Sequence, residues 1–324
     1  MQNSKVEICF IGNAIVDILS KMSNETLNKL KIPKGSMQLV DEEETNKILE
    51  CIQDPSIISG GSAANTAVGF NSLGGKCSFV GQIGNDKFGN LFSKDLNNSG
   101  IFFEFKNSQI TEKTSKSIIL VTPDAERSMN TFLGASIKFN INSFEEHFII
   151  NSSMIYIEGY LFDQPEAKEA IYHCCSLAKS QNKKVALSLS DLFCVDRHRI
   201  DFLNLIENYV DIIFANEHEI KSLYKSDLVQ SINTIKDNVD FGAITLGSKG
   251  AIVFENKAEY SIDPIFIEEL VDTTGAGDLF AAGFLFGFVN KYSIEKCGHL
   301  GNKAASEIIK HIGARPKISL KSIL

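Results

Sequence analysis

Short apolar runs alternate along the chain with segments whose apolar residues recur at helical spacing. The runs are rich in Val, Ile and Phe, and the first, at residues 6–11, ends at Gly12. Segments 166–180 and 199–209 have the helical pattern. Strands separated by helices are typical of βαβ units, so we expect an α/β fold, a three-layer α/β/α body around a mostly parallel sheet. The further predicted strands are 77–83, 185–190, 210–215, 241–246 and 250–255.

Two β-rich regions break this rhythm, at about residues 13–40 and 101–135. In the second, two strand-like runs flank Pro123 and Asp124, which set a turn and so indicate a hairpin. We expect these regions to form a small β-sheet lid beside the body. No linker or repeat divides the chain, so one domain over residues 1–324 is predicted.

Composition and charge narrow the classes of partner. The 324 residues are 44% hydrophobic and 22% charged, which is typical of a globular protein, and the net charge is -8. No basic block is longer than Lys183-Lys184, so neither nucleic acid nor an anionic membrane is expected as the main partner. The seven cysteines form no CxxC pair, and residues 1–20 lack the features of a signal peptide. We therefore expect a cytoplasmic protein.

The most informative stretch is DTTGAGD at residues 272–278, between a predicted strand at 265–271 and an apolar helix. Backbone amides at a helix start point outward and attract anions such as phosphate. Asp278, in the first turn, could take the proton of a hydroxyl that attacks phosphorus. Without a Lys after the glycines this is not a Walker A loop. The alternative is a capped helix start. The amides of the expected anion hole belong to Gly275, Ala276 and Gly277.

Polar residues at two other turns suggest a site for a polyol. Gly61 lets a ligand lie against the backbone at the start of a predicted helix, and Asn65, one turn later, can donate and accept. Asn13 and Asp17 follow the first strand, and ligands of open α/β sheets lie beyond the carboxyl ends of strands. Asp17 could accept from two neighbouring hydroxyls. Taken singly, each could instead be a packing, turn or capping residue.

Four motifs in order resemble those of the PfkB (ribokinase-like) family of carbohydrate and nucleoside kinases, over nearly the whole chain. They are GGSAAN at 60–65 with GQIGNDKFG at 81–89, NEHE at 216–219, TLGSKG at 245–250, and the stretch at 272–278. The resemblance implies a ribokinase-like fold and an ATP-dependent phosphotransferase with an alcohol acceptor. It implies that Asp278 is the general base and that Gly275, Ala276 and Gly277 form the anion hole.

The resemblance also implies an ATP site. Asn216 and Glu219 would organise Mg²⁺ and the phosphates, with Glu219 reaching the metal through water. Both could equally cap a helix, and the two roles are compatible. Segment 299–313 would flank adenine and, in some members, a monovalent cation such as K⁺. The residues implied for ATP are Asn216, Glu219, Thr245, Gly247, Gly250 and Asn302.

Within the family the chain looks most like the adenosine kinases, through GNAIVDI at 12–18 and YIEGYL at 156–161. This implies transfer of the γ-phosphoryl group to the 5′-hydroxyl of adenosine or a similar ribonucleoside. Arg127 would clamp the phosphates from the lid, unless it is a solvated turn residue. The residues implied for the ribose are Asn13, Asp17, Gly61 and Asn65, with Asp17 on the 2′ and 3′ hydroxyls.

The chain departs from that pattern in two ways. Thr274 stands where many adenosine kinases carry Asn, and there is no Trp, so a purine would stack on Phe132, Phe162 or Phe193.

The main alternative is a sugar kinase for ribose, fructose or a related furanose, which a polar rather than aromatic lid would favour. An NAD-dependent oxidoreductase would need GxGxxG after the first strand, and a silent nucleotide-binding protein would have lost Asp278. Lid closure should exclude water. The oligomeric state, monomer or dimer, is left open.

Overall fold

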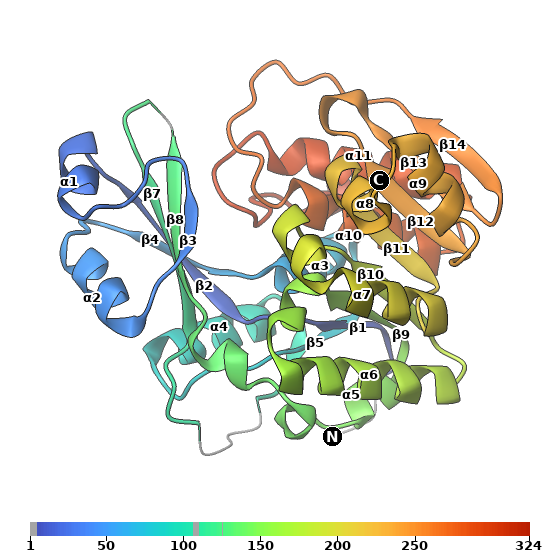
Figure 1. Ribbon diagram of the computed structural model, residues 1–324, viewed down its shortest axis with the longest axis horizontal. Coiled ribbons are helices and arrows are strands. Elements are labelled where there is room, and N and C mark those ends of the chain that lie inside the picture. The colour runs from blue at the N-terminus through green and yellow to red at the C-terminus, as the bar shows by residue number, and fades with distance from the viewer. Residues whose placement is uncertain (1–4, 106–109, 125) are drawn as a thin grey trace.

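The computed structural model describes residues 5–105, 110–124 and 126–324, which form two sheets of unequal size (Figure 1). The larger sheet has the order β14-β13-β12-β11-β10-β9-β1-β5-β6. All neighbouring strands are parallel except at β13 and β14, which are antiparallel. The strands are β1 (Val6–Ile11), β5 (Cys77–Val80), β6 (Phe102–Phe103), β9 (Ser152–Glu158), β10 (Lys184–Ser188), β11 (Ile212–Asn216), β12 (Phe241–Thr245), β13 (Ala251–Glu255) and β14 (Ala258–Ile262).

Helices cover both faces of this sheet, which confirms the expected three-layer body (Figure 1). Side chains of β1 alternate between the two cores, since Ile8 and Phe10 lie in one and Cys9 and Ile11 in the other. A parallel sheet buried on both faces requires such continuously apolar strands. One face carries α3 (Ser62–Leu73), α4 (Lys87–Asn98), α10 (Ala276–Val289) and α11 (Ile294–Ile308); the other carries α5 (His147–Ile150), α6 (Pro165–Ser180), α7 (Leu192–Asn208), α8 (Glu217–Tyr224) and α9 (Leu228–Ile235).

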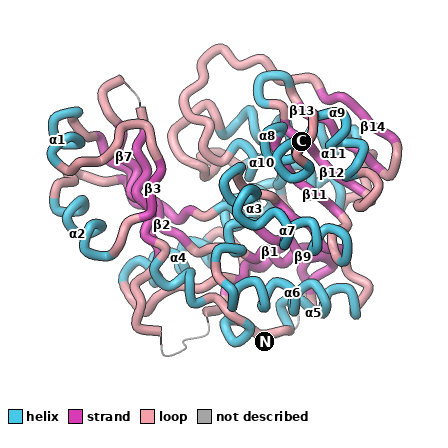
Figure 2. Tube along the Cα trace, in the orientation of Figure 1, coloured by secondary structure: helices cyan, strands magenta, loops and turns pink. Residues whose placement is uncertain are grey.

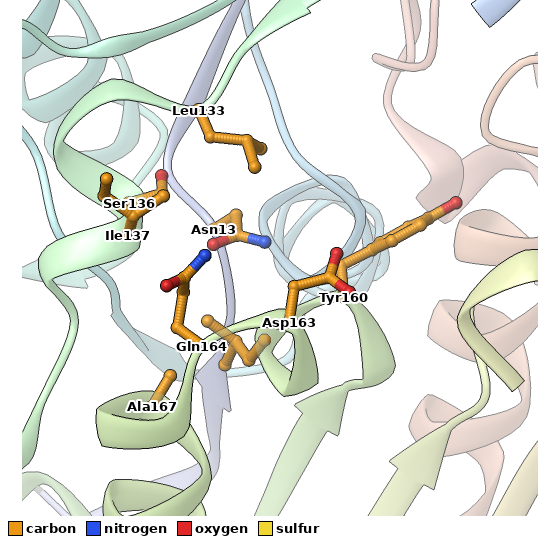
Figure 3. A pocket seen from close by; sticks show the side chains of 9 residues that line it. Asn13, Leu133, Ser136, Ile137, Tyr160, Asp163, Gln164 and Ala167 are labelled. Atoms are coloured by element: carbon orange, nitrogen blue, oxygen red, sulfur yellow. The ribbon is translucent and has the colours of Figure 1, made fainter. Parts of the chain in front are cut away.

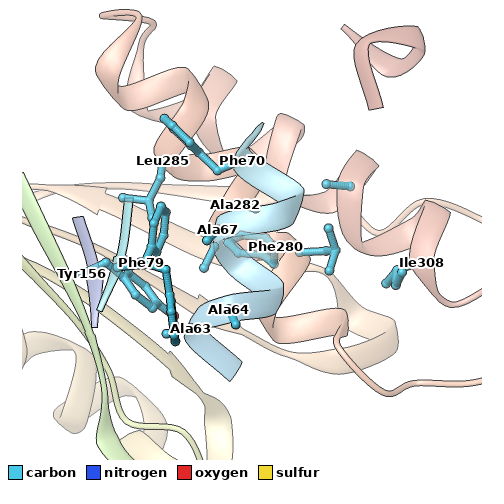
Figure 4. Packing of buried hydrophobic residues seen from close by; sticks show 14 of the residues in the cluster. Ala63, Ala64, Ala67, Phe70, Phe79, Tyr156, Phe280, Ala282, Leu285 and Ile308 are labelled. Atoms are coloured by element: carbon cyan, nitrogen blue, oxygen red, sulfur yellow. The ribbon is translucent and has the colours of Figure 1, made fainter. Parts of the chain in front are cut away.

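The helices α3 and α10 lie against each other at the centre of the molecule, and their small residues allow this (Figure 4). Ala64 and Ala67 of α3 are fully buried in the same core as Ala282 of α10. At Gly69, an added Cβ would lie 2.5 Å from Cδ1 of Leu279, so only glycine permits this approach. The contact matters because the glycine motifs predicted to bind ligand start these two helices.

One predicted strand is wrong. Residues 265–271 form an exposed loop, drawn as loop in Figure 2, and Phe266 is 88% exposed. The preceding Pro264 lacks an amide hydrogen, and residues 265–271 pair with no strand of either sheet. The apolar residues of this run therefore face solvent.

The smaller sheet has the order β3-β8-β7-β2-β4, and helices α1 (Asn24–Lys29) and α2 (Glu42–Glu50) lie on its outer side (Figure 1). The predicted hairpin is confirmed, since β7 and β8 pair antiparallel. The structure differs at the insertion boundaries, because β4 comes from beyond residue 40 and β6 joins the larger sheet. The division into domains stays a prediction. The strands are β2 (Ile15–Lys21), β3 (Met37–Leu39), β4 (Ser56–Gly60), β7 (Ser115–Val121) and β8 (Arg127–Phe132).

The short remaining elements are 3₁₀ helices: η1 (Gly134–Lys138), η2 (Ile141–Ser143), η3 (Gly159–Asp163), η4 (Gly247–Lys249) and η5 (Leu320–Ile323). Within the described residues, no helix combines the length and the apolar character that crossing a bilayer requires.

Candidate active site

A cavity of ≈ 720 Å³ lies between the two sheets, at the carboxyl ends of the parallel strands. It brings together polar residues from five separate sequence motifs, Ser62 of the motif at 60–65 among them. The sequence-predicted residues that line it are Asn13, Asp17, Asn216, Glu219, Thr245, Gly275, Ala276, Gly277 and Asp278. Within the described part of the chain, the other predicted residues lie outside its lining, namely Gly61, Asn65, Arg127, Gly247, Gly250 and Asn302.

The glycine turn presents free amides to this cavity. Gly275 caps α10 with a left-handed backbone (φ 80°), which glycine adopts without strain. The amides of Gly275, Gly277 and Asp278 donate to no acceptor among the described residues. The amide of Ala276 differs from the expectation, because it donates to the carbonyl of Thr273 at 3.1 Å and so closes the turn. The remaining amides stand at the positive end of α10 and can bind an anion.

Asp278 is held in place by two side chains of α3. Oγ of Ser62 donates to its Oδ1 at 2.7 Å, and Nδ2 of Asn65 donates to its Oδ2 at 2.9 Å. Burial raises the pKa of Asp278 to about 6, although both hydrogen bonds oppose that shift. A carboxylate with this pKa is ionised at neutral pH and basic enough to take a proton. Sequence reasoning had assigned no role to Ser62, although it follows the glycine pair directly.

Asp272 ties the turn to the chain around it. Its Oδ1 accepts from the amide of Thr274 at 2.9 Å and from the Thr274 hydroxyl at 2.7 Å, and its Oδ2 accepts from the amide of Gly313 at 2.8 Å. Arg127 of the small sheet forms an ion pair with Asp272 and donates to Oγ1 of Thr274 at 3.2 Å. Burial opposes ionisation, but the Arg127 contact and the amide donors together lower the pKa of Asp272. Arg127 therefore joins the lid to the glycine turn.

A buried carboxylate that the sequence reasoning missed, Glu158, fixes the turn that carries Asn13. It is fully buried at the end of β9, and it accepts from the amides of Asn13 at 2.8 Å and Ala63 at 2.7 Å. An added Cβ at Gly12 would lie 2.3 Å from Oε2 of Glu158, so the turn needs glycine there. Burial raises the pKa of Glu158 to about 7. The sequence offered one signal for this role, since Glu158 is a single acidic residue at the end of an apolar strand.

Asp17 lies on β2 with its carboxylate against the backbone of Gly60, where an added Cβ would be 2.2 Å from Oδ2. No donor among the described residues bonds to this carboxylate, so it is left for a ligand. Burial raises the pKa of Asp17 to about 7, while the Arg315 charge lowers it and Asp278 raises it. Arg315, also missed from the sequence, donates to the carbonyls of Ser59 at 2.8 Å and Ala64 at 3.3 Å.

Gly61 works through the backbone. Its φ of 91° is in the left-handed region, and an added Cβ would lie 2.3 Å from the carbonyl oxygen of Asn13. The carboxamide of Asn13 lines the main cavity and a side cavity of ≈ 10 Å³ (Figure 3). Gly61 thus allows the turn that carries Asn13 to contact the turn at the start of α3, and both turns were predicted to bind ligand.

Asn216 and Glu219 cap the start of α8, as the sequence analysis considered possible. Oδ1 of Asn216 accepts from the amide of Glu219 at 2.9 Å, and Oε2 of Glu219 accepts from the amide of Asn216 at 2.8 Å. Both also line the cavity, and burial raises the pKa of Glu219 to about 7. Among the described residues no group of three or more His, Cys, Asp or Glu could hold a metal ion. With Asn216 and Glu219 as the nearby side chains, the site fits a Mg²⁺ ion whose ligands are mostly phosphate oxygens and water.

The other residues predicted for ATP differ in their roles, because one lines the cavity, two make contacts within the fold and one has open space beside it. Thr245 lines the cavity at the end of β12. Gly250 is required by packing, because an added Cβ would lie 2.0 Å from the carbonyl oxygen of Ile262. Asn302 donates to the carbonyl of Asp263 at 2.7 Å. Gly247 has open space around its Cβ position and stays a candidate for backbone contact with a ligand.

The inner face of the small sheet carries both apolar and polar side chains. Strand pairing places Leu39, Thr131, Ser117 and Asp17 side by side across the sheet. Two residues along, Met37 pairs with Met129. No aromatic side chain of this sheet lines the cavity within the described residues. Its apolar lining residues are Ile15, Met37, Leu39 and Met129, and Leu133 follows directly after β8.

Of the three candidates for stacking, only Phe193 lines the cavity, and it is 69% exposed. Phe162 is core, with its ring 4.5 Å from that of Phe202. The ring of Phe132 lies beneath the ammonium group of Lys116 at 5.1 Å.

Comparison with known proteins agrees with this geometry. Residues 35–320 match the family described as pfkB family carbohydrate kinase. The fold is similar to that of a probable sugar kinase from Rhizobium etli CFN 42 (40% identity, 99% of this chain and 98% of that one, TM-score 0.91). It is also similar to adenosine kinase from Sinorhizobium meliloti (38% identity, 98% of both chains, TM-score 0.90). Adenosine kinase of Dictyostelium discoideum is 27% identical over 96% of both chains.

Proposed function

Because the chain belongs to the pfkB family of carbohydrate kinases, we propose that it transfers the γ-phosphoryl group of ATP to the 5′-hydroxyl of adenosine or a similar ribonucleoside. Membership makes the chain a phosphotransferase with an alcohol acceptor. The observation that carries the proposal is the position of Asp278, on the cavity wall beside the free amides of the glycine turn.

The reaction can be written for this chain's own residues. Asp278, oriented by Ser62 and Asn65, accepts the proton of the substrate hydroxyl as its oxygen bonds to the γ-phosphorus. The bond between that phosphorus and the ADP oxygen breaks, and its electron pair leaves with ADP. The amides of Gly275 and Gly277 donate to the oxygens of the transferring group, where preorganised donors stabilise the developing charge.

Asn216, Glu219 and Thr245 would face the nucleotide phosphates from the ends of β11 and β12. Mg²⁺, the metal that kinases generally use with ATP, would neutralise phosphate charge there, with Glu219 acting through water. Arg127, paired with Asp272, would hold the lid against the turn and exclude water during transfer. The monovalent cation stays a prediction.

The nucleoside assignment is supported by the shape and polarity of the acceptor end. Asn13 and the unpaired carboxylate of Asp17 suit the hydroxyls of a ribose. The adjoining lid face, with Met37, Leu39 and Met129, suits a flat apolar group such as a nucleobase. Met37 and Leu39 are 52% and 60% exposed, so a base bound against the lid would bury apolar surface there.

A second candidate is a furanose kinase. The hydroxyls of Ser117 and Thr131, 3.1 Å apart, give the lid face a polar strip beside Asp17. This strip would suit a free sugar better than a base.

Initial rates decide between the two candidates. Rates of phosphorylation of adenosine, ribose and fructose would be measured with ATP and Mg²⁺. Phosphorus NMR would show which oxygen of the product carries the phosphate. We expect kcat/KM for adenosine to exceed that for either sugar by about tenfold or more, because only the nucleoside covers the apolar lid face. A higher value for a sugar, or phosphate at a position other than the 5′-oxygen, would contradict the proposal.

A further inference from the structure

An ion pair that plays no part in the transfer step, Asp163 with Arg197, lies on the cavity wall. Nε and Nη2 of Arg197 donate to Oδ1 of Asp163 at 3.1 and 3.0 Å, and Nη2 also donates to Oδ2 at 3.1 Å. Nε2 of His198 lies 2.7 Å from the same Oδ1. Two side chains, through three nitrogen atoms, therefore hold one carboxylate that still faces a ligand-sized space.

The local backbone is built around this pair. Asp163 ends η3, and α7 is kinked at His198 (φ −118°, ψ 22°), the residue that reaches back to it. Ser190 is left-handed (φ 71°), and its hydroxyl accepts from the amide of Gly159 at 2.8 Å. A left-handed serine costs conformational energy, and such residues concentrate at ligand sites. Ser190, which also lines the cavity, thus ties η3 to the segment that leads into α7.

The pair lies at the acceptor end of the cavity and not at the phosphate end. Asp163 follows β9, which neighbours β1, the strand that leads to Asn13, whereas Asn216 ends β11, two strands away. Asp163 and Asn13 also line the same side cavity (Figure 3). A substrate with its hydroxyl on Asp278 and its ribose on Asn13 would extend toward Asp163.

The hydrogen-bonding capacity that remains is specific. Oδ1 of Asp163 is engaged by three donor atoms, but Oδ2 receives one, and Nη1 of Arg197 donates to no acceptor among the described residues. Because Nε and Nη2 hold the carboxylate, Nη1 lies on the side of the guanidinium that faces away from Asp163. The pair thus presents one free acceptor position, on Oδ2 of Asp163. This matches an exocyclic amino group of a nucleobase, which is a donor.

We propose that Asp163, held in place by Arg197 and His198, recognises the amino group of the nucleobase. Oδ2 of Asp163 accepts a hydrogen bond from that exocyclic amino group. The inference rests on the proposed nucleoside kinase function and deepens it, since it names an aminopurine-like base as the preferred substrate. Phe193, one helical turn before Arg197, lies on the same wall and would cover the face of that base.

The test compares adenosine with purine riboside, the same nucleoside without its amino group. We expect the wild-type protein to favour adenosine in kcat/KM by about tenfold or more, the usual effect of a hydrogen bond to a charged group. In Asp163→Asn the preference should fall to within about twofold, mainly through a higher KM for adenosine. A purely structural ion pair would lower both rates alike.

Two further variants complete the design. Arg197→Gln should also reduce the preference for adenosine over purine riboside. Because Arg197 is half-exposed on a helix, this variant tests the ion pair even if Asp163→Asn fails to fold. Asp196→Asn is the matched control, since its carboxylate accepts from the Ser222 hydroxyl. Equal wild-type rates on both nucleosides, or an unchanged preference in the variants, would overturn the inference alone. Turnover of ribose or fructose without turnover of either nucleoside would overturn the proposed function.

Discussion

Asn65 and Asp278 are 213 positions apart in the chain, yet Nδ2 of Asn65 donates to Oδ2 of Asp278 at 2.9 Å. The hydrogen bond joins the first turn of α3 to the first turn of α10, at the point where the two helices contact each other. It orients the carboxylate, and it also favours the ionised form over the protonated one. The tight packing of small residues between the helices is what places the candidate base.

Asp278→Asn should bind ATP and nucleoside but transfer phosphate at least ~100-fold more slowly, because a carboxamide cannot accept the proton. Rapid-quench measurement of the transfer step, with calorimetric titration of both ligands, checks this. Full activity in this variant would remove Asp278 from the mechanism.

Asn65→Ala should shift the pH dependence of kcat/KM. Burial raises the pKa of Asp278 to about 6 while Asn65 opposes the shift, so loss of Asn65 raises the pKa further. Because the base must be ionised, activity should fall more at pH 6 than at pH 8.5, and the acidic limb should move to higher pH.

Asn71→Ala is the matched control for that profile, since Asn71 lies on the same helix and donates to the carbonyl of Gly75. Its profile should match that of the unmodified protein. An acidic limb that does not move in Asn65→Ala would show that Asp278 is not the titrating base.

Two alanine substitutions in the glycine turn should have opposite effects on stability. Gly275→Ala should destabilise the fold by about 1–3 kcal/mol, because φ is 80° and the new Cβ would lie 2.6 Å from Cβ of Ala314. Gly277→Ala should leave stability unchanged or slightly higher, since nothing lies within 4 Å and alanine favours a helix. Its kcat/KM should nevertheless fall by about tenfold or more, because the methyl group takes the space above the anion-binding amides.

Thermal unfolding and initial rates, measured on Gly275→Ala and Gly277→Ala, separate the effect on stability from the effect on kcat/KM. If Gly277→Ala kept full activity, the phosphoryl group would not lie over this turn.

Asp17→Asn should weaken nucleoside binding and stabilise the protein at alkaline pH. The pKa of Asp17 is raised from 3.8 to about 7 in the folded state, so between these values the folded protein keeps a proton that the unfolded chain releases. Stability from this group is therefore present below pH 3.8 and is lost as the pH rises through 7. The variant avoids that loss, so its gain in Tm should be larger at pH 8 than at pH 5.

Calorimetric melting at the two pH values tests the stability effect, and steady-state kinetics test binding, with KM for adenosine rising about tenfold or more. A Tm difference independent of pH would show that Asp17 is ionised without penalty in the folded protein.

Local features of the sequence predicted much of the backbone. The apolar run of β1, the apolar character of α10, and the glycines at 60, 61, 275 and 277 are all visible in short windows, because strand pairing, helix burial and tight turns each need particular residue types at fixed spacing. The prediction of a strand at residues 265–271 was wrong, since an apolar run becomes a strand only where the fold pairs it with another strand, and a short window does not show that pairing.

Which charged groups meet was decided by the tertiary structure. Ser62 on Asp278, Glu158 on the amides of Asn13 and Ala63, and the lid Arg127 on Asp272 are contacts between residues far apart in the chain. A buried carboxylate needs donors wherever the fold brings them, and no local pattern encodes their place. The sequence by itself thus determined the kinds of group present, while the packing of α3 against α10 and of the lid against the body determined their partners and their pKa values.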